Sequence, residues 1–441
     1  MSPDVLNKDV FRQIEGVSPP VFFRNAGDLT LFYAPGYLAA AKKREAEEIT
    51  GILSGALPFG EDMTPHYLIR AALSAQAIWQ QMHDPENYRP TCLTLYTTLD
   101  CNLNCSYCFA KAAHREGVRL SKDLIMAAAR EVAGNCREKG EPFTAVFHGG
   151  GEPSLDSRLP DLLTDLQWIC KQAKVPFRSY IATNGVMDPE KARWIAAHFD
   201  RVGISVDGPP ELHNRQRPLR NGSESFRILE RTIKNISRIS ENLSFRVTVL
   251  PENFGRIPEI AGFIAERFDA EEIHIEPVYH QHIDADLADV FCESFLKAQS
   301  EKPAKIVSSG SRIGEVHGRF CQIFRQALHL VPPAGASSCF AVSSQEEAEE
   351  KQLDPMQDEA LFEKLSREDP DCEHCFNRFH CARGCPDVCP ALSVDARDAG
   401  SFRCRVNRRL AETELTETAE RLLFGPARNY GYAGVKLRED Q

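Results

Sequence analysis

The sequence predicts an α/β fold in its central part, with a small α+β region before it and a cysteine-rich extension after it. Two observations predict the central fold. Between residue 92 and about residue 280, runs rich in β-branched and aromatic residues alternate six times with helical patterns. Glycine and acidic residues recur directly after the predicted strands, where active sites lie in parallel α/β folds. Six such units predict a parallel sheet with helices outside.

The composition limits the classes of function that the protein can have. Of 441 residues, 42% are hydrophobic and 26% charged, which is ordinary for a chain with a real core. No run of about 18 apolar residues occurs, and the first residues lack a secretory signal, so we expect a cytoplasmic chain. A net charge of -11 argues against a nucleic-acid or anionic-membrane partner. Fifteen cysteines without an export signal indicate metal or redox use rather than disulfides.

Residues 1–90 form the first predicted region. Apolar runs at 21–24 and 29–34 flank Asn-Ala-Gly-Asp at 25–28, a hairpin signal, and helical patterns follow near 37–54 and 64–83. Such a module is similar to the leader-peptide recognition domain of ribosomal peptide maturases, in which a substrate strand pairs with a sheet edge. The alternative is that this region only packs on the central domain or starts its first helix.

The central domain is expected at residues 91–300. The predicted strands span 92–99, 143–148, 177–183, 202–206, 245–250 and 273–277, and helical patterns between them include 122–139, 162–174 and 226–239. After residue 300 this alternation is expected to stop. An acidic stretch at 346–371 predicts a solvated helical bridge, and residues 405–423 predict a charged amphipathic helix. The C-terminal helix and tail are expected at residues 411–441.

Three cysteines follow the first predicted strand: Cys101, Cys105 and Cys108. From one loop they can hold three corners of an iron–sulfur cube, and no fourth cysteine follows at short range, so one iron is left for a ligand that is not protein. The alternative is a structural zinc knuckle, but zinc sites usually pair two such cysteine groups.

The spacing Cys-x3-Cys-x-aromatic-Cys, with Tyr107 at the aromatic position, resembles that of the radical S-adenosylmethionine (radical SAM) superfamily. The resemblance implies a partial (β/α)6 barrel and a 4Fe-4S cluster whose open iron is chelated by S-adenosylmethionine. It also implies cleavage of the cofactor to methionine and a 5′-deoxyadenosyl radical, which abstracts a hydrogen atom.

Later strand ends carry the other candidate cofactor residues. In the family, a Gly-Gly-Glu-Pro run contacts the amino group of the cofactor, and Gly150, Gly151 and Glu152 match it. Asn184 follows the third strand. The resemblance also places a serine of the fourth strand, here Ser205, near the cofactor ribose or carboxylate.

Four further residues near these strand ends have two possible roles each. Asp207 and Arg217 either line the same cavity or cap a turn and form a salt bridge. Arg246 and Glu276, on later strands, are expected to be structural rather than functional.

The second cysteine group resembles the SPASM extension of radical SAM enzymes, expected here at residues 301–410. Its pattern is Cys-x2-Cys-x5-Cys-x3-Cys, starting at residue 372, with one more cysteine at 404. The resemblance implies an outer auxiliary cluster held by Cys372, Cys375, Cys381 and Cys404, and an inner one held by Cys321, Cys339 and Cys385. Zinc is the alternative for residues 372–385.

The inner set departs from the family pattern. Gly335 lies one residue closer to the second inner cysteine than usual, and Glu315 and His317 stand where some members have a fourth ligand. From this departure we expect the inner cluster implied by the resemblance either to have an open iron or to recruit Cys389 or His317. In all, the resemblance implies three 4Fe-4S clusters and S-adenosylmethionine.

The function predicted from these features is oxidative modification or cross-linking of a ribosomally made precursor peptide with a leader, with flavodoxin or ferredoxin as reductant. One alternative is an anaerobic sulfatase-maturating enzyme, although those have aspartate where Phe340 follows Cys339 here. Another is a small-molecule radical SAM dehydrogenase. An electron carrier without catalysis is the non-enzymatic alternative, and it leaves the glycine-rich strand ends unexplained.

Overall fold

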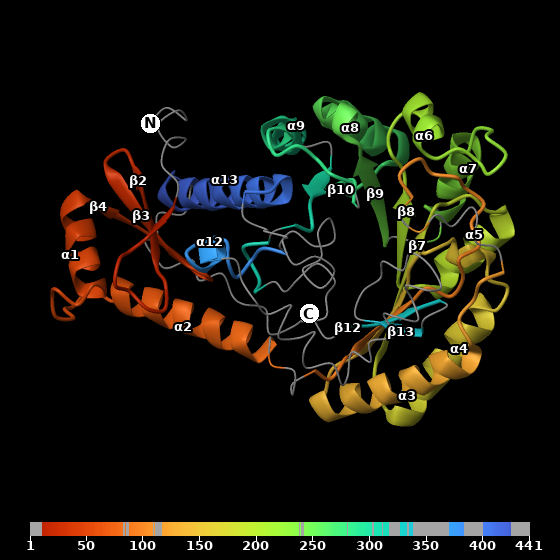
Figure 1. The fold of residues 1–441 in the computed structure, drawn as a ribbon, viewed down its shortest axis with the longest axis horizontal. Helices are drawn as coiled ribbons and strands as arrows, with labels where there is room; N and C mark the ends of the chain where they lie inside the picture. Colours follow the sequence, from red (N-terminus) through yellow and green to blue (C-terminus); the bar gives the residue numbers. More distant parts are fainter. Residues whose placement is uncertain are drawn as a thin grey trace.

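A central sheet and a smaller N-terminal module make up most of the protein in the computed structural model (Figure 1). The structure describes residues 11–82, 84, 88–108, 110, 117–237, 239, 242–279, 281–301, 304–310, 312–316, 327–332, 335–337, 370–382 and 400–424. Among these residues, no helix has both the length and the apolar character needed to cross a membrane.

The N-terminal module contains an antiparallel sheet and two helices. Its elements are β1 (Arg12–Gln13), β2 (Phe22–Ala26), β3 (Leu29–Ala34), β4 (Tyr37–Lys42), α1 (Lys43–Leu53) and α2 (Thr64–Met82). The predicted hairpin is confirmed, since β2 pairs with β3 around Gly27. The predicted helix from residue 37 is wrong up to residue 42. Its alanines favour a helix, but a turn at Gly36, with φ of 87°, returns the chain alongside β3 and the strand pairing prevails.

The central sheet confirms the predicted α/β fold. Six strands correspond to the predicted ones: β5 (Cys92–Leu95), β6 (Phe143–Phe147), β7 (Phe177–Thr183), β8 (Arg201–Ser205), β9 (Leu243–Val249) and β10 (Glu272–Pro277). The full order is β11-β10-β9-β8-β7-β6-β5-β12-β13.

The expectation that the alternation stops after residue 300 is wrong. Strand β11 (Lys305–Val307) adds in parallel to β10, and β12 (Ala327–Val331) adds in parallel to β5. The short β13 (Gly335–Ser337) is antiparallel to β12. Each edge of a six-stranded sheet offers unpaired backbone groups, and these two strands satisfy them.

Helices cover the outer face of the curved sheet (Figure 1). They are α3 (Lys122–Lys139), α4 (Leu159–Ala173), α5 (Pro189–His198), α6 (Pro210–Gln216), α7 (Phe226–Ile236), α8 (Ile257–Phe268) and α9 (Leu287–Glu301), with 3-10 turns η4 (Pro153–Leu155) and η5 (Pro251–Arg256). Alternate strand residues such as Leu93, Leu95 and Phe147 join the main core with these helices. The intervening residues line the inner face of the sheet.

The N-terminal module packs against the C-terminal segment. That segment contains α12 (Pro370–Glu373) and α13 (Phe402–Phe424), the latter confirming the helix predicted there. Tyr33 shares a hydrophobic cluster with Phe376 and with α13, and its hydroxyl lies 2.5 Å from Nε2 of His380. Trp79 of α2 contacts Phe379 edge to face. These contacts join the start of the chain to the segment that carries the second cysteine group.

Candidate functional site

The first cysteine group lies in a loop directly after β5, as predicted. The loop is held by the segment that leaves α6. The backbone N–H of Asn104 donates to the carbonyl of Pro218 at 2.9 Å, and that of Ser106 donates to the carbonyl of Gln216 at 2.9 Å. Because this pairing acts on the backbone, it orients the loop independently of the cysteine side chains.

Two of the three thiols have a raised pKa. Burial, with smaller contributions from Glu152 and the neighbouring cysteines, raises the pKa of Cys101 to about 12. Burial also raises the pKa of Cys105 to about 11, although the positive charge of Arg217 opposes this shift. Thiols with such a raised pKa stay protonated near neutral pH until a metal ion replaces the protons. Cys101 also lines a cavity of about 570 Å³ together with Asp100, Asn102, Gly117, Leu155, Leu219, Arg220 and Asn221.

The glycines after β6 lie against the backbone that leads into the cysteine loop. The N–H of Gly151 donates to the carbonyl of Thr98 at 3.1 Å, and the N–H of Glu152 donates to that of Asp100 at 2.7 Å. A Cβ on Gly151 would lie 2.2 Å from the carbonyl oxygen of Asp100. Only glycine allows this approach of two strand ends.

Glu152 ties three strand ends together. Its buried carboxylate accepts hydrogen bonds from Oγ1 of Thr183 at 2.7 Å, from N of Asn184 at 2.7 Å and from N of Ser154 at 3.1 Å. Burial raises the pKa of Glu152, and these hydrogen bonds oppose that shift. The side-chain amide of Asn184 donates to Oδ1 of Asn102 at 2.8 Å and lies 3.8 Å from Sγ of Cys101. Asn184 therefore reaches the cysteine loop itself.

Asp207 and Arg217 form a buried ion pair, one of the arrangements that the sequence leaves open for them. Nε of Arg217 donates to Oδ2 of Asp207 at 2.9 Å, and the Tyr107 hydroxyl donates to the same oxygen at 2.6 Å. The guanidinium carbon lies 5.3 Å from the centre of the Tyr107 ring. Burial alone would raise the pKa of Asp207, but Arg217 and the hydrogen bonds lower it below its usual value. The pair thus holds the aromatic residue of the cysteine loop.

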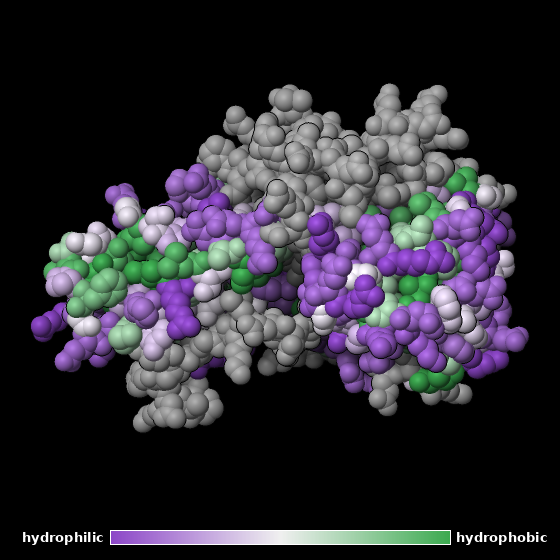
Figure 2. Space-filling model, turned by 90° about the horizontal axis from the view of Figure 1, so that it is seen from below, coloured by the Kyte–Doolittle hydropathy of each residue, from purple (hydrophilic) through white to green (hydrophobic). Residues whose placement is uncertain are grey.

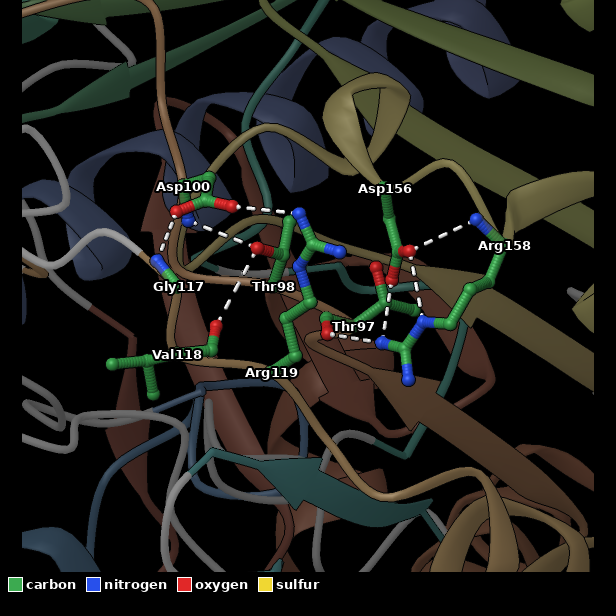
Figure 3. Close-up of polar contacts among 8 residues, drawn as sticks. All are labelled: Thr97, Thr98, Asp100, Gly117, Val118, Arg119, Asp156 and Arg158. Atoms are coloured by element: carbon green, nitrogen blue, oxygen red, sulfur yellow. Dashed lines mark hydrogen bonds and ion pairs between the residues drawn. The ribbon is translucent and has the colours of Figure 1, made fainter.

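Sequence reasoning missed a clamp at the base of the loop (Figure 3). Asp100 accepts hydrogen bonds from N of Gly117 at 2.6 Å and from a terminal nitrogen of Arg119 at 3.1 Å, so both ends of the loop are joined. Arg158 donates to Oδ2 of Asp156 at 2.8 Å and to the Thr97 carbonyl at 3.2 Å. The only signal for this clamp in the sequence is the aspartate immediately before Cys101.

The second cysteine group is described in part. Cys372 lies in α12 and Cys404 in the first turn of α13, while Cys375 borders the hydrophobic cluster around Phe376. The Asn407 amide, one turn beyond Cys404, lies 3.2 Å from Sγ of Cys381. The predicted ligands Cys321, Cys339, Cys385 and Cys389, and also His317, lie outside the described residues. Within the described part of the chain, no three His, Cys, Asp or Glu side chains converge on a single-ion site.

A comparison with protein-family models identifies the domain that carries the cysteine loop. Residues 95–264 match the model of the radical SAM superfamily, a range that contains the cysteine loop, the glycine run and the Asp207–Arg217 pair. The chain contains a radical SAM domain.

Curated relatives match part of the chain at low identity. The Fe-coproporphyrin III synthase of Methanosarcina barkeri is 25% identical over 171 residues, covering 38% of this chain and 39% of that protein. A cysteine-type anaerobic sulfatase-maturating enzyme of Clostridium perfringens is 22% identical over 178 residues, covering 38% of this chain and 46% of that enzyme. The chain thus spans less than half the length of these relatives.

Solved structures extend the likeness in fold beyond the radical SAM domain. The structure of anSMEcpe with bound AdoMet has a TM-score of 0.57 at 16% identity, covering 75% of this chain and 98% of that one. Streptococcus suis SuiB bound to its precursor peptide SuiA has a TM-score of 0.50 at 14% identity, covering 91% of this chain and 100% of that one.

The side chains present fit the cofactor that this family uses. Three thiols come from one loop of the radical SAM domain, which leaves one corner of a four-iron cube without a protein ligand. The glycines at 149–151 keep the strand end beside the loop free of Cβ atoms, and Cys101 lines an open cavity. Ser205, the last residue of β8, lies in register with Arg246 on the inner face.

Breaking the Asp207–Arg217 pair should destabilise the radical SAM domain strongly. Asp207→Asn removes a charge from a side chain with no exposed surface and leaves Arg217 buried without its partner, which costs about 3–5 kcal/mol. We expect a melting temperature lower by several degrees. The control is Asp286→Asn, which removes an exposed ion pair with Arg405 and should change stability little. Equal effects of the two variants would contradict the structural role of the buried pair.

Proposed function

We propose that the protein is a radical SAM enzyme that oxidatively modifies or cross-links residues of a ribosomally made precursor peptide. The observation that carries this proposal is the extent of the likeness to SuiB. It covers 91% of the chain, against 75% for the sulfatase-maturating structure, so it reaches beyond the part shared with anSMEcpe. SuiB was solved with its precursor peptide bound.

In this proposal, Cys101, Cys105 and Cys108 hold the 4Fe-4S cluster. When bound, the cluster and S-adenosylmethionine supply one-electron cleavage and a 5′-deoxyadenosyl radical. The chain positions them. Gly150, Gly151 and Glu152 receive the amino group of S-adenosylmethionine, with Asn184 and Ser205 beside it. The Asp207–Arg217 pair orients Tyr107 and, through it, the loop.

The N-terminal module would recognise the leader of the peptide. Figure 2 shows apolar side chains gathered over this module on the face seen from below. Within the residue range of the module, Phe59 is 60% exposed and Leu73 is 52% exposed. An apolar surface of this kind is typical of a binding face, and the module's sheet offers edges for strand addition. We further propose cytoplasmic location and reduction by a flavodoxin or ferredoxin.

The C-terminal cysteines would hold two auxiliary clusters, and this is testable by substitution. Cys375→Ala should lower the iron content by about four atoms per chain and stop product formation, while reductive cleavage of S-adenosylmethionine partly persists. The matched control is Cys170→Ala, a buried cysteine outside both groups, which should keep its iron. Unaltered product yield in Cys375→Ala would refute the auxiliary role.

Mass spectrometry of a co-expressed precursor tests the proposed reaction itself. The candidate precursor is the product of a short reading frame beside the gene. Each two-electron oxidation removes two hydrogens, so the peptide should become lighter by about 2 Da per event. An unmodified peptide, despite active cleavage of S-adenosylmethionine, would contradict the proposal.

Sulfatase maturation is the second candidate. It is favoured by the TM-score of 0.57 to anSMEcpe and by the curated sulfatase-maturating relative. It predicts an aldehyde on a cysteine- or serine-containing sulfatase peptide, which an aldehyde-reactive probe would label. Peptide cross-linking would give no such label.

A further inference from the structure

The inner face of the central sheet carries an arginine, Arg246, that forms no ion pair with the described residues. On β9, Phe245 and Val247 pack into the core with the helices, so Arg246 projects from the opposite face. Its Nε donates to the hydroxyl of Tyr180 at 2.9 Å, and its guanidinium carbon lies 5.8 Å from the centre of that ring. A neutral hydroxyl orients the cation but does not neutralise it.

The residues of the neighbouring strands fix the position of the contact between Tyr180 and Arg246. Tyr180 lies across Gly203 of the neighbouring strand β8, and a Cβ there would lie only 2.0 Å from the tyrosine oxygen. A glycine at 203 is therefore needed for Tyr180 to reach Arg246. Tyr180 is in register with Arg201 at the start of β8, whereas Ser205 ends that strand near the cysteine loop. The hydroxyl thus holds the guanidinium beside Gly203, two residues before Ser205.

The carboxylates of β10 on this face have other partners. Glu272 contacts His274 at 2.7 Å and Lys305 at 2.8 Å. Glu276 accepts a hydrogen bond from Oγ of Ser309 at 2.7 Å and one from the hydroxyl of Tyr279 at 3.0 Å. The charge of Glu276 raises the pKa of Arg246, but among the described residues no carboxylate forms an ion pair with this guanidinium.

Two histidines on the same face add no further positive charge near pH 7. Burial, together with the charge of Arg246, lowers the pKa of His148 to about 4 and also lowers that of His274. Both are therefore neutral near pH 7. Nδ1 of His148 is buried and has no hydrogen-bond partner among the described residues. Close to Arg246 the face thus offers neutral hydrogen-bonding groups and one carboxylate, Glu276, which Ser309 and Tyr279 already bind.

We propose that Arg246, oriented by Tyr180, binds a carboxylate of the substrate inside the barrel. A partly buried guanidinium with free donor positions is completed by an anion, and carboxylates match its geometry. The carboxylate is either the side chain of an acidic residue or a peptide C-terminus. This inference rests on the proposed function, because it assigns a feature of the peptide substrate. It makes Arg246 a specificity-determining residue, not a structural one.

Three small probes test the inference on the full-length, reconstituted protein with S-adenosylmethionine present. N-acetyl-glutamate α-amide carries a side-chain carboxylate, N-acetyl-glutamine carries a terminal one, and N-acetyl-glutamine amide is neutral. Titration calorimetry should show one carboxylate probe binding roughly ten-fold or more tightly than the neutral amide, as expected for a charge-assisted contact. The tighter of the two identifies the source of the carboxylate.

Variants connect that preference to Arg246. Arg246→Met should bring all three affinities within two-fold, and Arg246→Lys should retain part of the preference. Arg178→Met is the matched control, because Arg178 lies on the same face of β7 but is exposed. It should behave as the wild type. Iron content and melting temperature verify that each variant is folded. If Arg246→Met does not fold, the inference is tested with Arg246→Lys instead.

Several outcomes would overturn the inference. One is equal binding of all three probes by the wild type, and another is an undiminished preference in Arg246→Met. A third is a loss of affinity for S-adenosylmethionine in Arg246→Met without change in probe binding, which would assign Arg246 to the cofactor carboxylate. Failure of the proposed peptide reaction is detected separately, by assays of S-adenosylmethionine cleavage and by mass spectrometry of the peptide. Such a failure does not change the result of the probe titrations.

Discussion

Replacing Cys105 by alanine is expected to abolish cleavage of S-adenosylmethionine. A four-iron cube held by three protein ligands retains only two after this change, and the middle cysteine of the loop has no substitute within the described residues. Formation of 5′-deoxyadenosine should fall by roughly a thousand-fold or more, because the bound cofactor supplies the chemistry. About four irons per chain should be lost from anoxically reconstituted protein.

The matched control is again Cys170→Ala, which removes a buried thiol from α4 and should leave both measurements near the wild-type values. A variant at position 105 that keeps both its iron and its cleavage rate would contradict the assignment of the loop. Retention of iron with loss of cleavage would instead separate cluster binding from cofactor binding.

Local patterns account for what could be predicted of the fold. The strands and helices of the radical SAM domain carry strong apolar periodicity, and helix α3 coincides with the predicted span 122–139. The segment 37–42 reads as a helix because its alanines have high helix propensity, and only pairing with β3 makes it a strand. Strand β11 has three residues and depends on an edge that a distant part of the chain provides. Pairing of that kind has no local signature.

In the candidate site, too, local motifs could be predicted from the sequence but contacts between distant residues could not. The cysteine loop and the glycine run are short motifs with fixed spacing, so they can be found without a structure. Asp207 and Arg217 could be named from the sequence, but their pairing could not, because ten residues of chain leave many geometries open. The clamp of Asp156 and Arg158 on the carbonyl of Thr97 was missed, since carbonyl partners leave no trace in the sequence. Arg246 was expected to be structural, and its surroundings now favour a role in binding.

Gly151→Ala should be nearly as damaging to activity as loss of a cysteine, for a purely steric reason. The added methyl group would lie 2.2 Å from the carbonyl oxygen of Asp100 and 2.6 Å from the carbonyl carbon of Leu99. Both are backbone atoms at the base of the cysteine loop, so no side-chain rotation relieves the clash. The loop and the strand end must separate, which breaks the hydrogen bond from Gly151 to Thr98. We expect 5′-deoxyadenosine formation to fall by roughly a hundred-fold or more, since small displacements of a positioned reactant have effects of this size.

Gly134→Ala provides the opposite control within the same domain. Gly134 lies inside α3, and a Cβ there meets no atom within 4 Å. Alanine is the better helix former, so this variant should gain up to about 1 kcal/mol in stability and keep full activity. Cleavage assays and thermal unfolding on both variants separate steric damage at the site from a general effect of replacing glycine. If Gly151→Ala cleaves S-adenosylmethionine as fast as Gly134→Ala, the close approach of the two strand ends is not what shapes the site.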